Sequence, residues 1–158
     1  MQDNNASASS VLFADFDLDL GDIGGPLFWL PPADTSLVTH YEVYLANDTA
    51  ADWREHYATI PVGTTNLHIR AEKKLMTEST YLSHFVVYTR SSLVEQSTPS
   101  IHRIVDEFAS VSNISFTDLD LDRDEIGGLV AWDSPAKTDL VEGKQFAGSV
   151  AGFGIGMI

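Results

Sequence analysis

Hydrophobic and polar residues alternate along most of the first 110 positions, in short runs separated by turn residues. From Val11 to Leu20 the alternation is strict, which predicts a half-buried strand whose aspartates face solvent and whose inward face is Leu12, Ala14, Phe16, Leu18 and Leu20. Similar runs predict strands over residues 27–30, 38–45, 57–60, 66–71, 81–90 and 99–105. Residues 21–26, which include Gly24-Gly25, are expected to form the tight turn after the first strand.

Helical periodicity is nearly absent, and only residues 73–79 have the composition for a single helical turn. Short strands at roughly ten-residue spacing, with turn chemistry between them, are typical of an antiparallel β-sandwich. We therefore predict an all-β fold over residues 11–110. Residues 1–10 are rich in Asn, Ser and Ala, and they are predicted to form a flexible leader.

One stretch of the chain occurs twice. Aligned at a constant offset of 103, residues 11–38 and 114–141 are identical at 14 of 28 positions, including Phe13 with Phe116 and Trp29 with Trp132. This is an internal repeat about one domain long. The second copy leaves the pattern after Val141, and residues 111–158 are too few for a seven-stranded sandwich. They predict a partial second repeat with the first two strands, followed by an apolar, glycine-rich tail.

Charge excludes some classes of partner. The 158 residues carry a net charge of −14, which argues against direct binding of nucleic acid or of an anionic membrane. The apolar tail over residues 145–158 falls short of the ~20 residues that span a bilayer. There are no cysteines, so disulfides and thiolate metal sites are excluded.

Several landmarks appear in the order found in one known family. The run Trp29-Leu30-Pro31-Pro32 and residues 38–44 resemble strands B and C of a fibronectin type III domain. Leu75, Ser79 and Tyr81 resemble the tyrosine corner of that family, and residues 81–90 and 97–99 resemble its strands F and G. The resemblance covers about residues 11–110 and implies an immunoglobulin-like sandwich. The Asp-rich first strand departs from the family pattern, and the chain lacks an Arg-Gly-Asp tripeptide, so no integrin-type role is implied.

The repeated acidic stretch is the candidate metal site, because aspartate is depleted in strands and calcium is bound by six to eight oxygen ligands. Alternate side chains on a strand lie about 6.6 Å apart, so two neighbouring aspartates could share one ion, but three could not without a bulge. An EF-hand loop is excluded, because neither copy supplies its Gly and Glu. The alternatives are an acidic edge that prevents aggregation and a surface for a basic protein. The candidate ligands of Ca²⁺ are Asp15, Asp17, Asp19, Asp22, Asp118, Asp120, Asp122, Asp124 and Glu125.

Outside the acidic stretches the candidates are few. Trp53 lies in a predicted loop, where an indole could stack on a sugar, and Phe146, Phe153 and Ile155 could dock the tail onto a partner. No pattern of catalytic or phosphate-binding residues occurs, so an enzyme is not expected. We expect a structural or adhesive repeat of a larger tandem-repeat protein, stiffened by cations and contacting neighbouring repeats, for which an extracellular or cell-surface location is slightly favoured. The alternatives are a small accessory subunit and a glycan-binding module.

Overall fold

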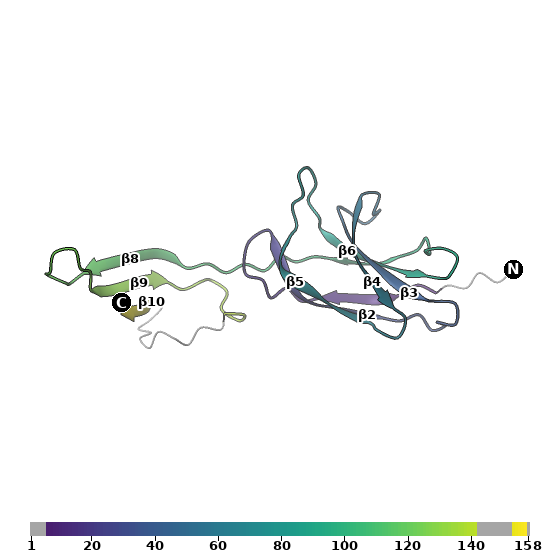
Figure 1. Cartoon of the computed structure of the whole chain (residues 1–158), viewed down its shortest axis with the longest axis horizontal. Helices are drawn as coiled ribbons and strands as arrows, with labels where there is room; N and C mark the ends of the chain where they lie inside the picture. Colours follow the sequence, from purple (N-terminus) through teal and green to yellow (C-terminus); the bar gives the residue numbers. More distant parts are fainter. Residues whose placement is uncertain (1–5, 142–152, 158) are drawn as a thin grey trace. The chain divides into compact units, whose positions relative to one another are not determined.

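The structure is a computed structural model that describes residues 6–141 and, by their backbone alone, residues 153–157. The chain divides into two compact units (Figure 1). The first comprises Met1–Asp17 and Gly21–Glu107, and the second comprises Leu18–Leu20 and Phe108–Ile158.

The described part of the first unit holds seven strands in two antiparallel sheets. One sheet has the order β1-β2-β5, made by β1 (Ser9–Phe13), β2 (Asp22–Leu30) and β5 (Asn66–Lys74). The other has the order β4-β3-β6-β7, made by β3 (His40–Ala46), β4 (Arg54–Pro61), β6 (His84–Arg90) and β7 (Ser100–Arg103). No helix occurs among the described residues, and the all-β prediction is confirmed. The predicted helical turn at 73–79 is wrong, because residues 73–74 continue β5 and Met76 bridges to Tyr81.

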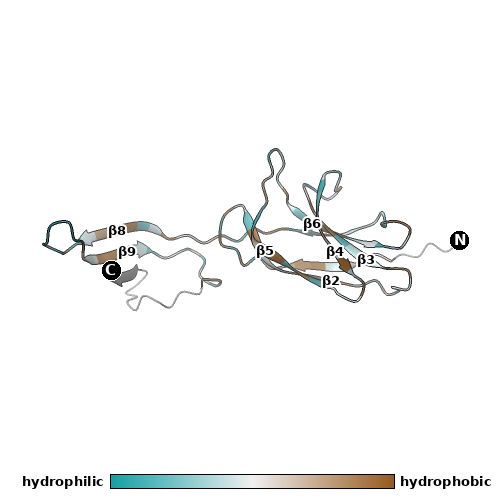
Figure 2. Ribbon diagram, viewed as in Figure 1, coloured by the Kyte–Doolittle hydropathy of each residue, from teal (hydrophilic) through white to brown (hydrophobic). Residues whose placement is uncertain are grey.

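Apolar side chains from both sheets form one core, and the strands that contribute them include strongly hydrophobic stretches in Figure 2. On β3, Tyr41, Val43 and Leu45 are fully buried, as their alternation predicts. Aromatic pairs join the two sheets: the rings of Phe13 and Phe85 lie 4.8 Å apart, and those of Trp29 and Tyr41 lie 5.4 Å apart. The core side chains include Val11, Ile23, Leu27, Trp29, Tyr41, Val43, Leu45, Ile69, Leu75, Leu82, Phe85 and Val87.

The first predicted strand is shorter than expected, and its predicted inward face points outward. β1 ends at Phe13, and Leu12 and Phe16 are 61% and 58% exposed. Asp15 and Asp17, which were expected to face solvent, are only 5% and 9% exposed. The reason is that Phe13 packs on Phe85, which fixes the register of the alternation and turns every second residue after it inward.

The turn after the first strand also lies earlier than predicted. Residues 19–21 form it, and Gly24-Gly25 lie inside β2 at an irregularity in the pairing with β5. A Cβ on Gly25 would stand 2.2 Å from the carbonyl oxygen of Ala14, and the φ of Gly25 is +147°. A Cβ on Gly24 would stand 2.7 Å from the Cα of Ala71. The two glycines therefore permit close approach of neighbouring backbones rather than a reversal of the chain.

The corner before β6 differs from the tyrosine corner that the sequence suggests. Tyr81 is 49% exposed, and its neighbour Leu82 is fully buried instead. The turn is closed by Thr77 and Thr80, whose backbone and hydroxyl groups exchange hydrogen bonds of 2.9–3.1 Å. The backbone N–H of Leu82 then donates to the carbonyl oxygen of Leu75 at 2.7 Å.

The predicted leader is partly incorporated into the sandwich. The Thr89 hydroxyl donates to the carbonyl oxygen of Ala6 at 2.7 Å, the Ser7 hydroxyl donates to that of Thr98 at 3.0 Å, and Ala8 is buried. Ordered structure therefore begins before Val11. Residues 1–5 lie outside the described part of the chain.

The second unit contains a three-stranded antiparallel sheet of order β10-β9-β8. Its strands are β8 (Ser112–Asp118), β9 (Gly128–Asp133) and β10 (Phe153–Met157). β8 and β9 are the two strands predicted for the second copy, and every residue of β8 is exposed. β10 adds part of the tail to the sheet through its backbone.

Candidate functional site

The carboxylate of Asp15 is a hub of backbone hydrogen bonds where the first hairpin turns. Its Oδ1 accepts from the N–H of Asp17 at 3.1 Å and from that of Gly24 at 3.0 Å. Its Oδ2 accepts from the N–H of Glu107 at 3.0 Å, 92 positions further along the chain. The side chain therefore joins both strands of the hairpin to the segment that follows β7.

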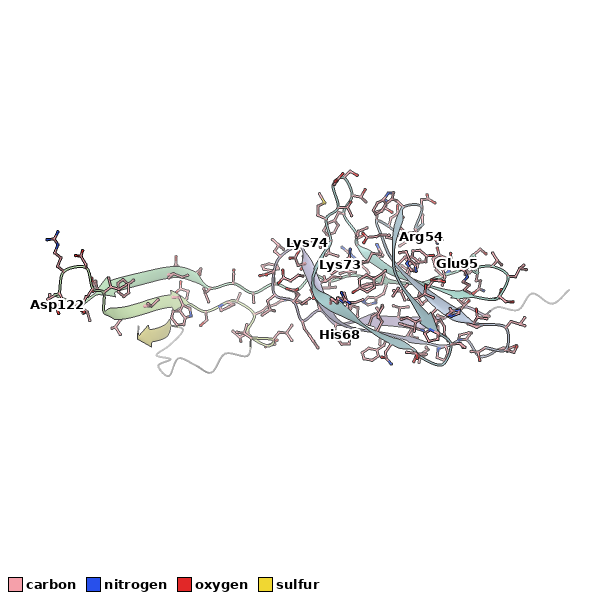
Figure 3. All side chains as sticks on the ribbon, viewed as in Figure 1. Arg54, His68, Lys73, Lys74, Glu95 and Asp122 are labelled. Atoms are coloured by element: carbon pink, nitrogen blue, oxygen red, sulfur yellow. The ribbon has the colours of Figure 1, made fainter. Side chains whose placement is uncertain are left out.

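Other acidic groups near this turn also have protein partners. Asp17 Oδ2 accepts from the N–H of Glu72 at 2.7 Å. Asp22 forms an ion pair with Lys74, which is labelled in Figure 3 and lies at the end of β5. Asp106 accepts from the N–H of Gly21 at 2.9 Å. In the first copy, therefore, the buried aspartates bind backbone N–H groups of neighbouring segments. Neither a solvent-facing acidic edge nor a row of cation ligands predicts this arrangement.

Burial raises the pKa of the Asp15 carboxyl above its ordinary value. The hydrogen bonds from Gly24, Glu107 and Asp17 lower the pKa but do not outweigh burial, and the negative charge of Asp106 adds to the rise. Backbone N–H groups thus stabilise the ionised form of Asp15, whereas removal of the carboxylate from water destabilises it.

The same local structure recurs in the second copy. Asp118 Oδ1 accepts from the N–H of Asp120 at 3.0 Å and from that of Gly127 at 3.1 Å, just as Asp15 does nine residues before Gly24. The N–H of Leu119 donates to the carbonyl oxygen of Gly127 at 2.6 Å, and the equivalent bond from Phe16 in the first copy has the same length.

Backbone dihedrals repeat as well. Ser10 and Asn113, which are 103 positions apart, have φ values of +49° and +50°. Gly21 and Asp124, again 103 apart, have φ values of +91° and +68°. Non-glycine residues seldom adopt this left-handed region, so its recurrence shows that both stretches form the same unusual backbone.

The second copy brings three of the predicted metal ligands together. Asp120, Asp122 and Glu125 each place one carboxylate oxygen within 4.8 Å of the other two, and we call this group the carboxylate cluster. Asp122 and Glu125 are exposed, and Asp122 is labelled in the turn of Figure 3. Asp124 is not part of this group, and its Oδ2 lies 3.7 Å from the Nε of Arg123. Three oxygens are fewer than the six to eight of a calcium site, so water would have to supply the remainder, and cation binding stays a prediction.

Two other predicted site residues, Asp19 and Trp53, lie in bends of the chain. Asp19 is exposed in the first turn, and Trp53 is 42% exposed in the bend before β4. Phe146 lies outside the described residues, and Phe153 and Ile155 are described only by the backbone of β10. Docking by the tail therefore also stays a prediction.

One charged network was missed by sequence reasoning. Glu42 on β3 is only 3% exposed, and its carboxylate contacts His56 Nε2 at 2.9 Å, the Thr59 hydroxyl at 2.5 Å and Arg90 Nη1 at 3.2 Å. Burial alone would raise the pKa of Glu42, but these three hydrogen bonds outweigh it and leave the pKa below its ordinary value. The contacts join neighbouring strands β4, β3 and β6 whose pairing the sequence does not display. One indication of this network is present in the sequence, namely an acidic residue among the apolar residues of β3.

A second cluster covers the neighbouring part of this sheet. The guanidinium of Arg54 lies 4.4 Å from the ring centres of both Tyr44 and Tyr88, and it forms a 2.7 Å ion pair with Glu95 (Figure 3). The Tyr44 hydroxyl donates to Glu95 at 2.7 Å. Burial, followed by Glu95, raises the pKa of Tyr44 to about 12. This arrangement is a cation–π stack closed by an ion pair.

The Glu42 network is not arranged as a catalytic relay. In a relay the histidine contacts the nucleophile through one ring nitrogen and the orienting acid through the other. Here the Thr59 hydroxyl, at 3.2 Å, and Glu42 both contact Nε2 of His56. The geometry favours cross-strand bracing of the sheet.

Comparison with known proteins identifies no relative. No protein-family model, no curated protein and no solved structure matches the chain. Among the residues that the structure describes, no helix is long and apolar enough to cross a membrane.

Proposed function

We propose that the chain is a non-catalytic structural module, of fibronectin type III kind, that belongs to a tandem-repeat protein with a structural or adhesive role. Support for this kind of sandwich comes from the division of the strands, with the first, second and fifth in one sheet and the fourth, third, sixth and seventh in the other. The repeated sequence and its repeated hydrogen bonds support the tandem array. Neighbouring repeats are the expected partners, at a cell surface or outside the cell.

The observation that carries the proposal is the bond from the Glu107 N–H to Asp15. A spacer must resist bending where the chain leaves a domain, and residues 106–107 are held there by two bonds to the first hairpin turn. The acidic stretch is thus a brace at the exit of the sandwich. Its presence in both copies is what an array of similar joints requires.

Single-molecule stretching of the whole chain tests this role. We expect the first sandwich to unfold in one discrete step, and extending the 95 residues from Ser9 to Arg103 adds roughly 300 Å of contour length. Asp15→Ala is expected to lower the force of this step, whereas the matched variant Asp118→Ala leaves the force unchanged. Gradual extension without a step, or equal effects of the two variants, contradicts the proposal.

A specific observation favours a second candidate, an accessory subunit that docks through its second unit. Apolar side chains are exposed there, namely Ile114, Phe116, Leu119, Leu121, Ile126 and Leu129. In this case deletion of residues 145–158 abolishes association with a larger assembly. In the spacer proposal the same deletion leaves the fold of the first sandwich intact, which circular dichroism measures.

A glycan-binding module is the third candidate, and it depends on the exposure of Trp53. Titration of the chain with a panel of oligosaccharides, read by tryptophan fluorescence, tests it, with Trp53→Phe as the control. The spacer proposal predicts a flat response across the panel.

A further inference from the structure

The hairpin β8–β9 keeps the side chains with which β1–β2 packs into its sandwich. Phe13, Asp15, Asp17, Ile23 and Trp29 face the core or the buried turn of the first unit. Their counterparts 103 positions later are the same residue types: Phe116, Asp118, Asp120, Ile126 and Trp132. Two further buried positions change only in size, since Val11 corresponds to Ile114 and Leu27 to Val130.

Most outward-facing positions on the strands have not been kept, although the exposed Ser9 and Asp19 recur as Ser112 and Asp122. Leu12, Phe28 and Leu30 are exposed in the first hairpin, and their counterparts are Ser115, Ala131 and Asp133. Identity is therefore concentrated on the face that packs against β3 and β6. A hairpin whose only requirement were solubility would have no reason to keep an Ile at position 126, where the side chain is 67% exposed.

Charge complementarity identifies the strand that would receive this hairpin. Residues 112–133 contain six acidic residues and one basic residue. β5 carries Arg70, Lys73 and Lys74 beside one acidic residue, Glu72. Lys73 pairs with Glu55, and Lys74 pairs with Asp22 of the resident hairpin. Glu125 occupies the position equivalent to Asp22, so it presents the same charge to the same lysine.

We propose that β8–β9 of one chain takes the place of β1–β2 in the sandwich of a second copy of this chain, where β9 pairs with that copy's β5 instead of with its own β10 and the hairpin packs on β3 and β6. The second copy contains every group that the hairpin needs. Its Phe85 and Tyr41 receive Phe116 and Trp132, and its Glu107 N–H donates to Asp118. Such exchange joins chains head to tail.

The free energy of exchange is the difference between burying β8–β9, which also gives up the pairing of β9 with β10, and releasing β1–β2. The resident hairpin also has the advantage of being attached to the sandwich that it completes. Exchange is therefore a minor process in the intact chain, and it becomes dominant when β1–β2 is weakened. This inference concerns the choice of partner and stands apart from the spacer role.

Disulfide trapping of the full chain tests the proposal, because the chain has no cysteines of its own. Lys74 and Asp22 are directly paired across β5 and β2, a separation that suits a disulfide. A Lys74→Cys chain and a mass-tagged Glu125→Cys chain are mixed under a mild oxidant. The control mixture pairs Lys74→Cys with a tagged Ser115→Cys chain, whose cysteine lies on the outward face.

We expect disulfide-linked heterodimers in the first mixture and their loss in the control. Adding Trp29→Ala to the Lys74→Cys chain is expected to raise the yield at least about tenfold, because losing a buried indole weakens the hold of the resident hairpin by that factor or more. Both hairpins are intact in the first two mixtures, so their comparison holds even if the Trp29→Ala chain does not fold. Equal yields in the two mixtures, or no heterodimer in the first, overturn the proposal.

Discussion

Replacing Asp15 by Ala is expected to cost the first sandwich about 3 kcal/mol of unfolding free energy. The carboxylate accepts three backbone hydrogen bonds, and each is worth about 1 kcal/mol net when its partner would otherwise be left buried and unsatisfied. For a domain of this size the loss corresponds to a fall in Tm of roughly 12–20 °C.

The magnitude depends on which bonds are lost. Asp15→Asn keeps one acceptor oxygen for Asp17 and Gly24 but turns an amide group toward the N–H of Glu107, so about 1 kcal/mol is expected. Asp118→Ala is the matched control, because Asp118 makes two of the same bonds in an exposed hairpin outside the sandwich. It is expected to change the stability of the first unit by less than about 0.5 kcal/mol.

Urea unfolding followed by circular dichroism measures all three variants. The raised pKa of Asp15 adds a dependence on pH. Because the native pKa lies above the ordinary value of 3.8, the contribution of the carboxyl is complete below pH 3.8 and declines as the pH rises through the native value. The difference in unfolding free energy between wild type and Asp15→Ala should therefore become smaller as the pH rises through that range. If Asp15→Ala lowers the unfolding free energy by no more than Asp118→Ala does, the reasoning is refuted.

Three further changes have expected outcomes. Gly25→Ala should lower the unfolding free energy of the sandwich by about 3 kcal/mol or more, because the new Cβ would stand 2.2 Å from a backbone oxygen. Gly63→Ala is the control in the same urea assay: Gly63 has a φ of +96° but open space around it, so a loss of about 1 kcal/mol is expected. The pKa of Glu42 is lowered in the native state, so its contribution to the unfolding free energy is present above the ordinary pKa of 4.5 and is lost as the pH falls through the native pKa. The unfolding free energy of Glu42→Gln should therefore depend less on pH in the acid range than that of the wild type. About 1 mM calcium should leave the Tm of the first sandwich unchanged, whereas a rise of roughly 10 °C would reveal a site with a Kd of about 10 μM.

Alternation predicted the strands well where one face is plainly apolar. On β3 the inward residues were read correctly, because their outward neighbours His40, Glu42 and Tyr44 are polar or amphipathic. In the first strand both faces carry large apolar residues, Leu12 and Phe16 on one and Phe13 on the other. Period-two alternation does not say which of two such faces is buried.

The candidate site was misread for a related reason. A buried aspartate looks unfavourable until its hydrogen-bond donors are known, and those of Asp15 come from positions 17, 24 and 107. One signal was present in the sequence: the second copy keeps Asp118 and Gly127 at the same spacing of nine as Asp15 and Gly24. The cross-strand contacts of Glu42 have no such signal, because they depend on the pairing of β3 with β4 and β6.

The long reach of Asp15 has a consequence for biosynthesis. The first hairpin is translated early, but the donor at Glu107 is added 92 residues later. At the usual rate of roughly 5–20 residues per second, the nascent chain waits several seconds with this carboxylate incompletely paired. The hydrogen bonds of Asp15 are complete only when residues beyond β7 have left the ribosome, so the first sandwich reaches its full stability late in synthesis.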